Sequence, residues 1–180
     1  MIRTATPGDA PAMLAIYAPH VAHGAATFET EVPSLTAMRE RIETRIRHYP
    51  WLVWEESGQV LAYAYAGRFR ERAAYDWITE TSIYVDPAAQ RRSIARRLYG
   101  ALFDVLRRQG FTQAMGVITL PGAASVALHE ALGFVPAGRW RDAGYKLGRW
   151  WNVGVWQKTL APSTTPPPAP VPFADLRKAV

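Results

Sequence analysis

The order in which strand-like and helix-like patterns follow one another most constrains the fold of this chain. Residues 80–85, ETSIYV, form a run of strand length that ends at Asp86 and Pro87. A helical pattern follows, Gly110 ends it, and residues 114–120 form another strand pattern. The predicted buried face of this helix comprises Ile94, Leu98, Leu102, Val105 and Leu106. Strand, helix and strand in this order predict part of an α/β sheet.

Two helices are predicted ahead of this unit. The first begins near Asp9, after a short N-terminal strand, and brings its apolar residues to one side. The second covers residues 34–48, with Ser34 as its N-cap and an apolar residue about once per turn.

Further strand patterns occur on both sides of the unit. Residues 51–69 are typical of a β-hairpin with its turn at Ser57 and Gly58. Residues 125–134 predict a short helix, and residues 145–160 predict the last strand or strands. A strand meander followed by alternating strands and helices predicts a mixed α/β sheet with helices on both faces.

The length of the chain is that of one domain. Its 180 residues, of which 49% are hydrophobic and 12% aromatic, can bury a core without a disulfide or a structural metal. We predict one domain over residues 1–160. The stretch APSTTPPPAPVPF is too rich in proline for a helix or a central strand, so we predict an extended tail over residues 161–180.

The absence of cysteine excludes several kinds of chemistry. Disulfides, thiolate nucleophiles and cysteine-based zinc sites cannot form, and the four histidines do not have metal-ligand spacing. The N-terminal residues lack the apolar core of a signal peptide, and no apolar run approaches the length of a membrane span. We therefore expect a cytoplasmic protein that binds neither a metal nor a membrane.

A formal net charge of +6 and a pI near 9.9 indicate an anionic partner. Nucleic acid, a membrane surface and a phosphorylated cofactor all fit that charge. The positive residues are mostly arginines spread along the chain, and they do not form a nucleic-acid-binding motif with interleaved aromatic residues. A nucleic-acid-binding protein is therefore disfavoured.

Residues 86–102, DPAAQRRSIARRLYGAL, concentrate this charge at the start of a helix. Unpaired backbone N–H groups and the positive end of the helix dipole lie at such a start and suit a pyrophosphate. Small residues at Ser93 and Ala95 let phosphates approach the backbone. Further donors are Gln90, Arg91, Arg92 and Arg96. The alternative is an ordinary amphipathic helix whose arginines are solvated.

The segment QRRSIA, residues 90–95, resembles the (Q/R)-x-x-G-x-(G/A) signature with which GNAT-superfamily acetyltransferases hold the pyrophosphate of acetyl-CoA. Further motifs have the order and spacing of the branch that contains phosphinothricin, methionine sulfoximine and methionine sulfone N-acetyltransferases. They are YPWLV, AYAG, AYDW, SIYV, QGF, SVALHEALGF and WNVGVWQ. The resemblance covers residues 2–160. It implies a GNAT fold, with a twisted and mostly antiparallel sheet between helices, and a homodimer that transfers the acetyl group of acetyl-CoA to a small amino-acid-like amine.

The resemblance also implies roles for individual residues. Glu80 corresponds to the general base, and His129 stands where many GNAT enzymes carry a tyrosine that protonates the CoA thiolate. Judged by residue type alone, Glu80 is also readable as a surface carboxylate in an ion pair, and His129 as a helix histidine bound to a neighbour. The predicted cofactor-binding residues are Ile83, Tyr84, Val85, Gln90, Arg91, Arg92, Ser93, Ile94, Ala95, Arg96, Gly122 and Ser125.

A second set of residues matches the positions that bind the acceptor in this branch. The members are Phe28, Arg70, Arg72, Tyr75, Thr119 and Val153. The guanidinium groups of Arg70 and Arg72 suit a carboxylate together with a phosphinate or sulfone oxygen, because each offers a planar fork of donors. The alternative for residues 70–75 is a polar loop with a buried tyrosine.

Three residues depart from the family pattern. Ser93 replaces the first glycine of the pyrophosphate signature, and a helical φ is expected to accommodate it. Its side chain would either crowd a phosphate or add a hydroxyl donor. Gly122 replaces an asparagine near CoA, so one hydrogen bond to the cofactor is in doubt. Thr119 replaces a glycine that faces the acceptor, and its bulk favours an acceptor of a different shape from phosphinothricin.

Two further functions stay open at this stage. Ser93 and Gly122 are compatible with a GNAT domain that binds CoA without catalysis, and the acceptor could instead be an aminoglycoside or a peptide N-terminus. Polycationic acceptors prefer an acidic pocket, whereas Arg70 and Arg72 favour an anionic one. The aromatic segment 148–156 is consistent with a dimer interface and equally with a buried strand.

Overall fold

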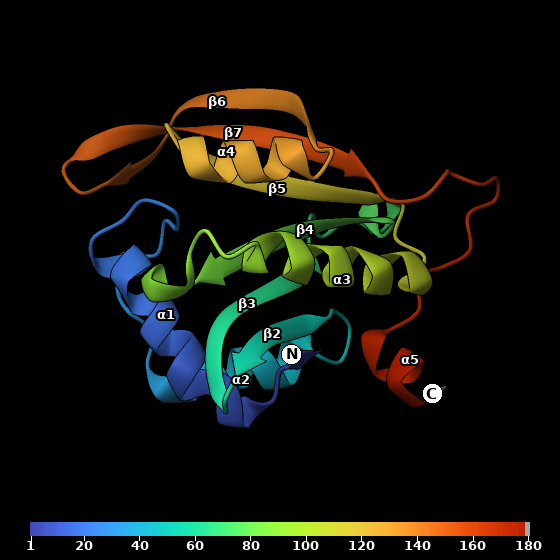
Figure 1. Ribbon diagram of the computed structural model, residues 1–180. Helices are drawn as coiled ribbons and strands as arrows, with labels where there is room; N and C mark the ends of the chain where they lie inside the picture. The colour runs from blue at the N-terminus through green and yellow to red at the C-terminus, as the bar shows by residue number, and fades with distance from the viewer. Residues whose placement is uncertain (179–180) are drawn as a thin grey trace.

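One seven-stranded sheet runs through the molecule, with strand order β1-β2-β3-β4-β5-β7-β6 (Figure 1). This computed structural model describes residues 1–178. The strands are β1 (Ile2–Thr4), β2 (Trp51–Glu56), β3 (Gln59–Arg68), β4 (Ile78–Val85), β5 (Gln113–Leu120), β6 (Val135–Lys146) and β7 (Arg149–Thr159). The helices are α1 (Ala10–Ala22), α2 (Leu35–Arg45), α3 (Ile94–Gln109), α4 (Ala123–Ala131) and α5 (Phe173–Lys178).

The sheet is antiparallel except at its centre, where β4 and β5 run parallel. These two strands pair only over residues 78–80 and 113–115. Beyond Glu80, β4 stays paired with β3 as far as Val85, while β5 stays paired with β7 as far as Leu120. The two halves of the sheet therefore part beyond Glu80.

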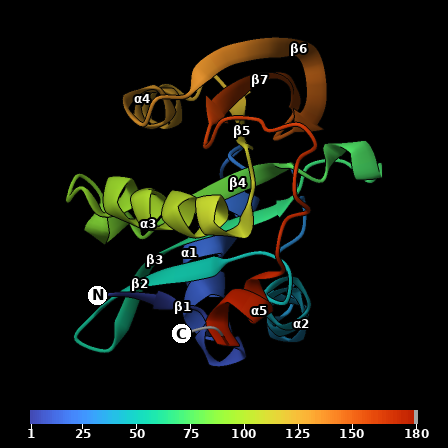
Figure 2. The ribbon, with the colours of Figure 1, turned by 90° about the vertical axis from the view of Figure 1, so that its right-hand side faces the viewer.

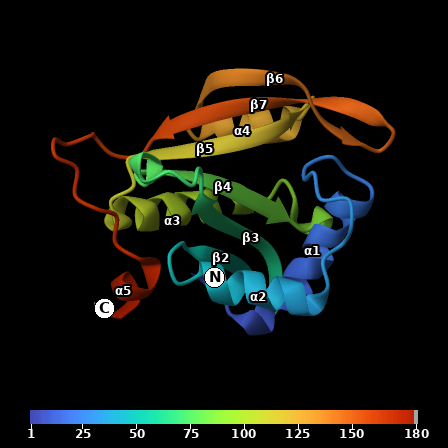
Figure 3. The same ribbon diagram turned by 180° about the vertical axis from the view of Figure 1, so that it is seen from behind.

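Helices cover both faces of the sheet and bury a separate core on each. Figures 1 and 3 view the molecule from opposite sides, with α3 and α4 in front in one and α1 and α2 in front in the other. Met13, Ile42 and Val53 belong to the core under α1 and α2, whereas Leu98 and Ala64 belong to the core under α3. The predicted mixed, mostly antiparallel sheet with helices on both faces is confirmed.

The helix cap, the hairpin turn and the helix end that local sequence signals predicted are all present in the structure. The Ser34 hydroxyl accepts a hydrogen bond from the N–H of Ala37 at 3.1 Å and so caps α2. Ser57 and Gly58 form the hairpin turn between β2 and β3 with φ values of 49° and 78°. Gly110 ends α3 with a φ of 95°, a conformation that glycine adopts without steric cost.

The predicted buried face of α3 was too narrow. Ile94, Leu98, Leu102 and Leu106 are buried as expected, but Val105 is only partly buried. Tyr99 and Phe103 are also buried, because His129 of α4 packs against Tyr99, and Phe134, three residues beyond the end of α4, packs against Phe103.

Two element boundaries also differ from the prediction. The chain does not pass directly from β4 into α3, because a 3-10 turn at Pro87–Ala89 and residues 90–93 come between them. β6 begins at Val135, about ten residues earlier than expected. Its side chains are exposed along almost its whole length, so the strand has little apolar alternation to reveal it.

The proline-rich segment lies along the surface of the domain. Residues 161–172 form neither helix nor strand, as predicted, but residues 173–178 form the helix α5, so the extended tail predicted for residues 161–180 is wrong there. The helix packs on the domain, and the N–H groups of Phe173 and Ala174 donate to the carbonyl oxygens of His48 and Arg47 after the end of α2 (Figure 2). The side-chain N–H of Gln109 donates to the carbonyl oxygens of Val171 and His48 at 2.8 and 2.9 Å, and Phe173 is buried. The division of the chain at residue 160 stays a prediction.

Within residues 1–178, no helix combines the length and hydrophobicity needed to cross a membrane.

Candidate functional site

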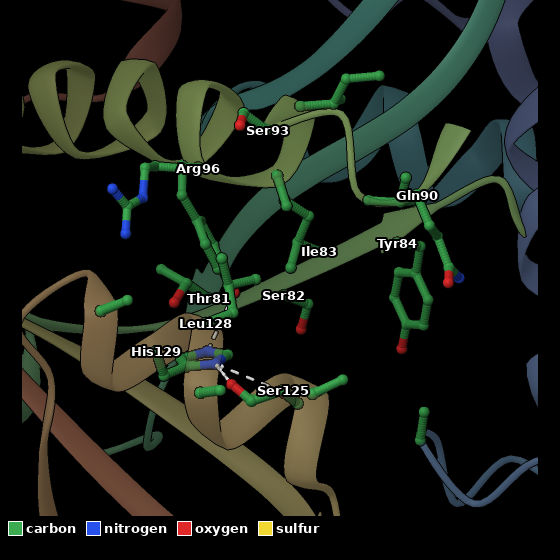
Figure 4. Close-up of a pocket in the computed structure, with 18 of the residues that line it drawn as sticks. Thr81, Ser82, Ile83, Tyr84, Gln90, Ser93, Arg96, Ser125, Leu128 and His129 are labelled. Atoms are coloured by element: carbon green, nitrogen blue, oxygen red, sulfur yellow. Dashed lines mark hydrogen bonds between the residues drawn. The ribbon is translucent and has the colours of Figure 1, made fainter. Parts of the chain in front are cut away.

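A cavity of about 730 Å³ lies where β4 and β5 part. Its walls are formed by β4, by the start of α3 and by α4, with His20 and Ala26 contributed from the end of α1 and the loop after it. Figure 4 shows Ser93 and Arg96 on one side of β4, and Ser125 and His129 on the other. The volume is within the range typical of small-molecule sites.

The start of α3 provides hydrogen-bond donors to this cavity. The N–H groups of Ile94, Ala95 and Arg96 belong to the first helical turn and have no earlier carbonyl to bind, and the side chain of Ser93 does not cap them. Arg91 and Arg96 line the same wall and add positive charge. Uncapped amides, the helix dipole and two guanidinium groups together fit the pyrophosphate of acetyl-CoA.

Ser93 does not have the helical φ that the sequence analysis expected. Its φ is 58° and its ψ is 8°, so the residue lies in the left-handed region. Arg91, two residues earlier, has a φ of 61°. The reason is the tight passage from β4 into α3, which turns the backbone sharply twice within residues 90–93. A serine stands at a position whose backbone conformation favours glycine.

Ten of the twelve predicted cofactor-binding residues line the cavity. They are Ile83, Tyr84, Val85, Gln90, Arg91, Ser93, Ile94, Ala95, Arg96 and Ser125. Arg92 lies outside it and pairs with Glu56 on the surface at 2.6 Å. Gly122 also lies outside, at the start of α4, where a Cβ would stand 2.6 Å from the carbonyl oxygen of Thr119. Packing against the preceding turn therefore accounts for the glycine at position 122.

Glu80 lies at the point where the sheet divides. It is the last residue of β4 that pairs with β5, opposite Met115, and it faces Gly67 of β3. Because side chains alternate along a strand, Glu80, Ser82 and Tyr84 share the face covered by α1. Burial raises the pKa of the Glu80 carboxyl, and the nearby charge of Arg70 partly offsets that rise. A half-buried carboxylate with a raised pKa has the properties of a general base.

Both ring nitrogens of His129 have partners. Nδ1 lies 2.8 Å from the carbonyl oxygen of Ser125, and Nε2 lies 3.4 Å from the Tyr99 hydroxyl (Figure 4 shows the Ser125 side). Burial lowers the pKa of His129, which is 4% exposed. The imidazole is therefore neutral at neutral pH.

Sequence analysis missed several residues of the cavity wall, namely His20, Thr81, Ser82 and Tyr99. Tyr99 was missed because only one row of α3 was assigned to the core. Tyr99 lies five residues after Ile94, next to the row of apolar residues that was predicted to be buried. A prediction with a wider apolar face on this helix would have included Tyr99. Thr81 and Ser82 belong to the strand whose later residues were predicted to line the site.

The predicted acceptor-binding residues lie outside the cavity that the cofactor residues line. Arg70, Arg72 and Tyr75 are exposed in the segment between β3 and β4, and the guanidinium of Arg70 stacks on Phe69 at 4.8 Å. Phe28 lies in the α1–α2 loop with its ring against Gly144 of β6, where a Cβ would collide with it. The influence of Arg70 on the pKa of Glu80 places one of these residues near the carboxylate.

Thr119 and Val153 are cross-strand partners on β5 and β7. Thr119 lies on the same face of β5 as Val117, which lines the cavity, because the two are separated by one residue. Val153 is buried, so any contact with an acceptor would require movement of its neighbours. In residues 1–178, no three His, Asp or Glu side chains gather as they would around a metal ion.

The left-handed φ of Ser93 predicts that Ser93→Gly stabilises the protein. Release of the steric cost, about 1–2 kcal/mol, exceeds the extra chain entropy of glycine, about 0.5–1 kcal/mol, so a net gain of roughly 0.5 kcal/mol is expected in urea unfolding. Ser57→Gly is the matched control, because Ser57 also has a positive φ but lies in the β2–β3 turn. Only Ser93→Gly should tighten acetyl-CoA binding in calorimetry. Weaker binding would show instead that the hydroxyl contacts the phosphate.

Comparison with known protein families identifies the domain. Residues 2–154 match the acetyltransferase (GNAT) domain family. The phosphinothricin N-acetyltransferase of Streptomyces viridochromogenes is 39% identical, with 94% of this chain and 92% of that protein aligned. The L-methionine sulfoximine/L-methionine sulfone acetyltransferase of Salmonella typhimurium is 34% identical, with 92% of this chain and 97% of that protein aligned.

Solved structures agree with this comparison. The crystal structure of a phosphinothricin acetyltransferase from Sinorhizobium meliloti in complex with acetyl-CoA matches with a TM-score of 0.87 and 36% identity, covering 94% of this chain and 92% of that chain. The structure of an acetyltransferase from Salmonella typhimurium with acetyl-CoA matches with a TM-score of 0.85 and 34% identity. The match covers 89% of this chain and 94% of that chain. The chain therefore belongs to the GNAT family of acetyl-CoA-dependent N-acetyltransferases.

Proposed function

We propose that the acceptor of this N-acetyltransferase is the α-amino group of a small, anionic, amino-acid-like molecule of the phosphinothricin, methionine sulfoximine or methionine sulfone type. The observation that carries the proposal is the position of Glu80, between the donor cavity and a segment with two exposed arginines. The names of the similar acetyltransferases from Streptomyces viridochromogenes and Salmonella typhimurium point to the same acceptor class.

The donor half of the site holds acetyl-CoA through the start of α3 and the strand β4. The amides of residues 94–96 and the side chains of Arg91 and Arg96 bind the pyrophosphate, while residues 83–85 of β4 lie along the cavity beside the pantetheine arm. Beyond Glu80 these residues have no pairing with β5, so part of their backbone is free to bind a ligand. Bound acetyl-CoA supplies the thioester that the amine attacks.

Glu80 prepares the acceptor for that attack. An α-amino group is protonated near neutral pH and must lose a proton before its lone pair can reach the thioester carbon. The half-buried carboxylate accepts this proton directly or through a water. Because the chain has no cysteine to carry the acetyl group, the group passes directly from the thioester to the amine, without an acetylated enzyme.

Positive charge favours an anionic acceptor over an aminoglycoside. Arg70 and Arg72 stand on one short segment without a carboxylate partner among the described ion pairs of residues 1–178. A polycationic acceptor would be repelled there, whereas a carboxylate or phosphinate would gain charge-assisted hydrogen bonds. A CoA-binding domain without catalysis is disfavoured, because Glu80, a carboxyl whose pKa burial raises, directly precedes the β4 residues that line the cavity.

The assay that tests this function mixes the protein and acetyl-CoA with L-methionine sulfone, methionine sulfoximine or phosphinothricin and follows release of free CoA. We expect turnover of at least one of them. Glu80→Gln should lower kcat by about 100-fold, since it removes a general base, and leave the calorimetric affinity for acetyl-CoA within about twofold.

Glu43→Gln provides the matched control, because Glu43 is exposed on α2 away from the cavity. Tight binding of acetyl-CoA without transfer to any amine would reassign the protein as a CoA-binding domain. Turnover with an aminoglycoside but with none of the three anionic amines would refute the acceptor class. An unchanged rate for Glu80→Gln would remove Glu80 from the reaction.

The charge of Arg70 predicts a change in pH dependence. A general base works when deprotonated, so kcat/KM falls as the pH drops through the pKa of Glu80. Arg70 lowers that pKa, so Arg70→Gln should raise it and move the acidic limb of the kcat/KM profile to higher pH. Arg72→Gln removes an equal charge that does not shift Glu80, so this control should reduce acceptor affinity without moving the limb.

We infer that two copies of the chain associate through β6. This strand is the outer edge of the sheet, is 12 residues long and has almost entirely exposed side chains. Trp140, Tyr145 and Trp150 on β6 and β7 are 44%, 60% and 61% exposed, which is unusual for large aromatic residues. Unpaired strand edges and exposed aromatics are typical of surfaces that another chain covers.

The cytoplasmic location stays a prediction.

Light scattering after size exclusion tests this association. The wild type should have twice the 20.1 kDa mass of one chain. Trp150→Glu should yield the single-chain mass, because it places a charge in the apolar contact. Val32→Glu, at another exposed apolar residue, should leave the mass unchanged. A single-chain mass for the wild type would refute the homodimer.

A further inference from the structure

His129 has no nitrogen available to a molecule in the cavity. The Ser125 carbonyl can only accept a hydrogen bond, so Nδ1 carries the proton and donates it at 2.8 Å. Nε2 is then an acceptor, and the nearby hydroxyl of Tyr99, at 3.4 Å, is placed to donate to it. Both ring nitrogens are thus engaged by protein groups, and Tyr99 is the ionisable side chain next to Nε2.

Close packing keeps the imidazole in this orientation. Its ring lies edge-on to Tyr99 and to Phe134, with centroid distances of 5.5 and 4.9 Å. On the sheet side it rests on Gly116, where an added Cβ would stand 2.6 Å from Cδ2. The ring has no room to turn Nε2 toward a different partner.

Tyr99 itself extends from α3 to the place where the sheet divides. It lines the cavity, and its ring stacks on Phe103 at 5.2 Å. Its hydroxyl also interacts with Thr81, the residue after Glu80, and Thr81 in turn donates to the carbonyl oxygen of Met115 at 3.2 Å. Burial raises the pKa of Tyr99, so the phenol keeps its proton until a base accepts it.

We propose that Tyr99 is the residue that exchanges protons with the reacting atoms, and that His129 acts behind it as the proton acceptor. The inference rests on the acetyl transfer proposed above. It assigns the group at the reacting centre to α3, whereas the sequence resemblance assigned it to α4.

The proton movements balance without an outside acid. Attack by the amine forms the new C–N bond and leaves a surplus proton on nitrogen. This proton passes, directly or through a water, to the Tyr99 oxygen while the phenolic proton moves to Nε2 of His129. When the C–S bond breaks, its electron pair stays on sulfur, the imidazolium returns a proton to Tyr99, and Tyr99 protonates the sulfur. One proton has moved from nitrogen to sulfur, and both side chains are restored.

A double-mutant cycle tests the relay. Tyr99→Phe removes the hydroxyl and keeps the ring, and it should lower kcat by about 100-fold while each KM stays within about twofold. His129→Gln should lower kcat to a similar extent. The double variant should be no slower than either single variant, because each breaks the same route. Tyr49→Phe is the matched control: Tyr49 stacks on Phe111 outside the cavity, and its kcat should not change.

Three results would overturn the proposal. The first is wild-type kcat in Tyr99→Phe, and the second is a double variant whose loss is the product of the two single losses. The third is a Tyr99→Phe effect on KM alone. If Tyr99→Phe melts early, Gly116→Ala serves instead. Its Cβ would stand 2.6 Å from Cδ2 and 2.8 Å from Nε2 of His129, so the imidazole must shift, and kcat should fall while acetyl-CoA affinity is kept. Absence of turnover by the wild type would refute the acetyl transfer itself, which separates the two failures.

Discussion

The interrupted pairing between β4 and β5 is the constraint on which the rest of the site depends. The strands share only residues 78–80 and 113–115 and then part. A continuous sheet would satisfy every backbone group between them and leave no space for a ligand. Because they part, residues 81–85 line a cavity of about 730 Å³, and Glu80 is the residue that directly precedes them. The helices α3 and α4 close the same cavity from one face.

The site also stores local backbone strain. Two residues with side chains, Arg91 and Ser93, have φ values of 61° and 58° in the short passage from β4 into α3. This passage directs the uncapped amides of α3 into the cavity, where an anion can satisfy them. The steric cost is borne where phosphate binding benefits from the geometry, which is common at functional sites.

Burial sets the protonation states on the two faces of the sheet. It raises the pKa of Glu80 and Tyr99 and lowers that of His129, so each group tends toward its neutral form. On the α1 face, Arg70 moderates the effect on Glu80 and keeps the carboxylate usable as a base. On the α3 face, the hydrogen bond to the Ser125 carbonyl partly offsets the effect of burial on the pKa of His129. Contacts with Ser125 and Tyr99 hold the neutral imidazole in one tautomer.

The sequence by itself determined the elements that depend on local signals, including the cap at Ser34, the turn at Ser57 and Gly58 and the end of α3 at Gly110. These signals act within a few residues and do not need the fold. Only the tertiary structure decided that Ser93 is left-handed, that Arg92 pairs with Glu56, and that Tyr99 covers His129. The last two are contacts between segments far apart in the chain, and the φ of Ser93 follows from how β4 and α3 are placed. All of these positions are set by sheet pairing and core packing.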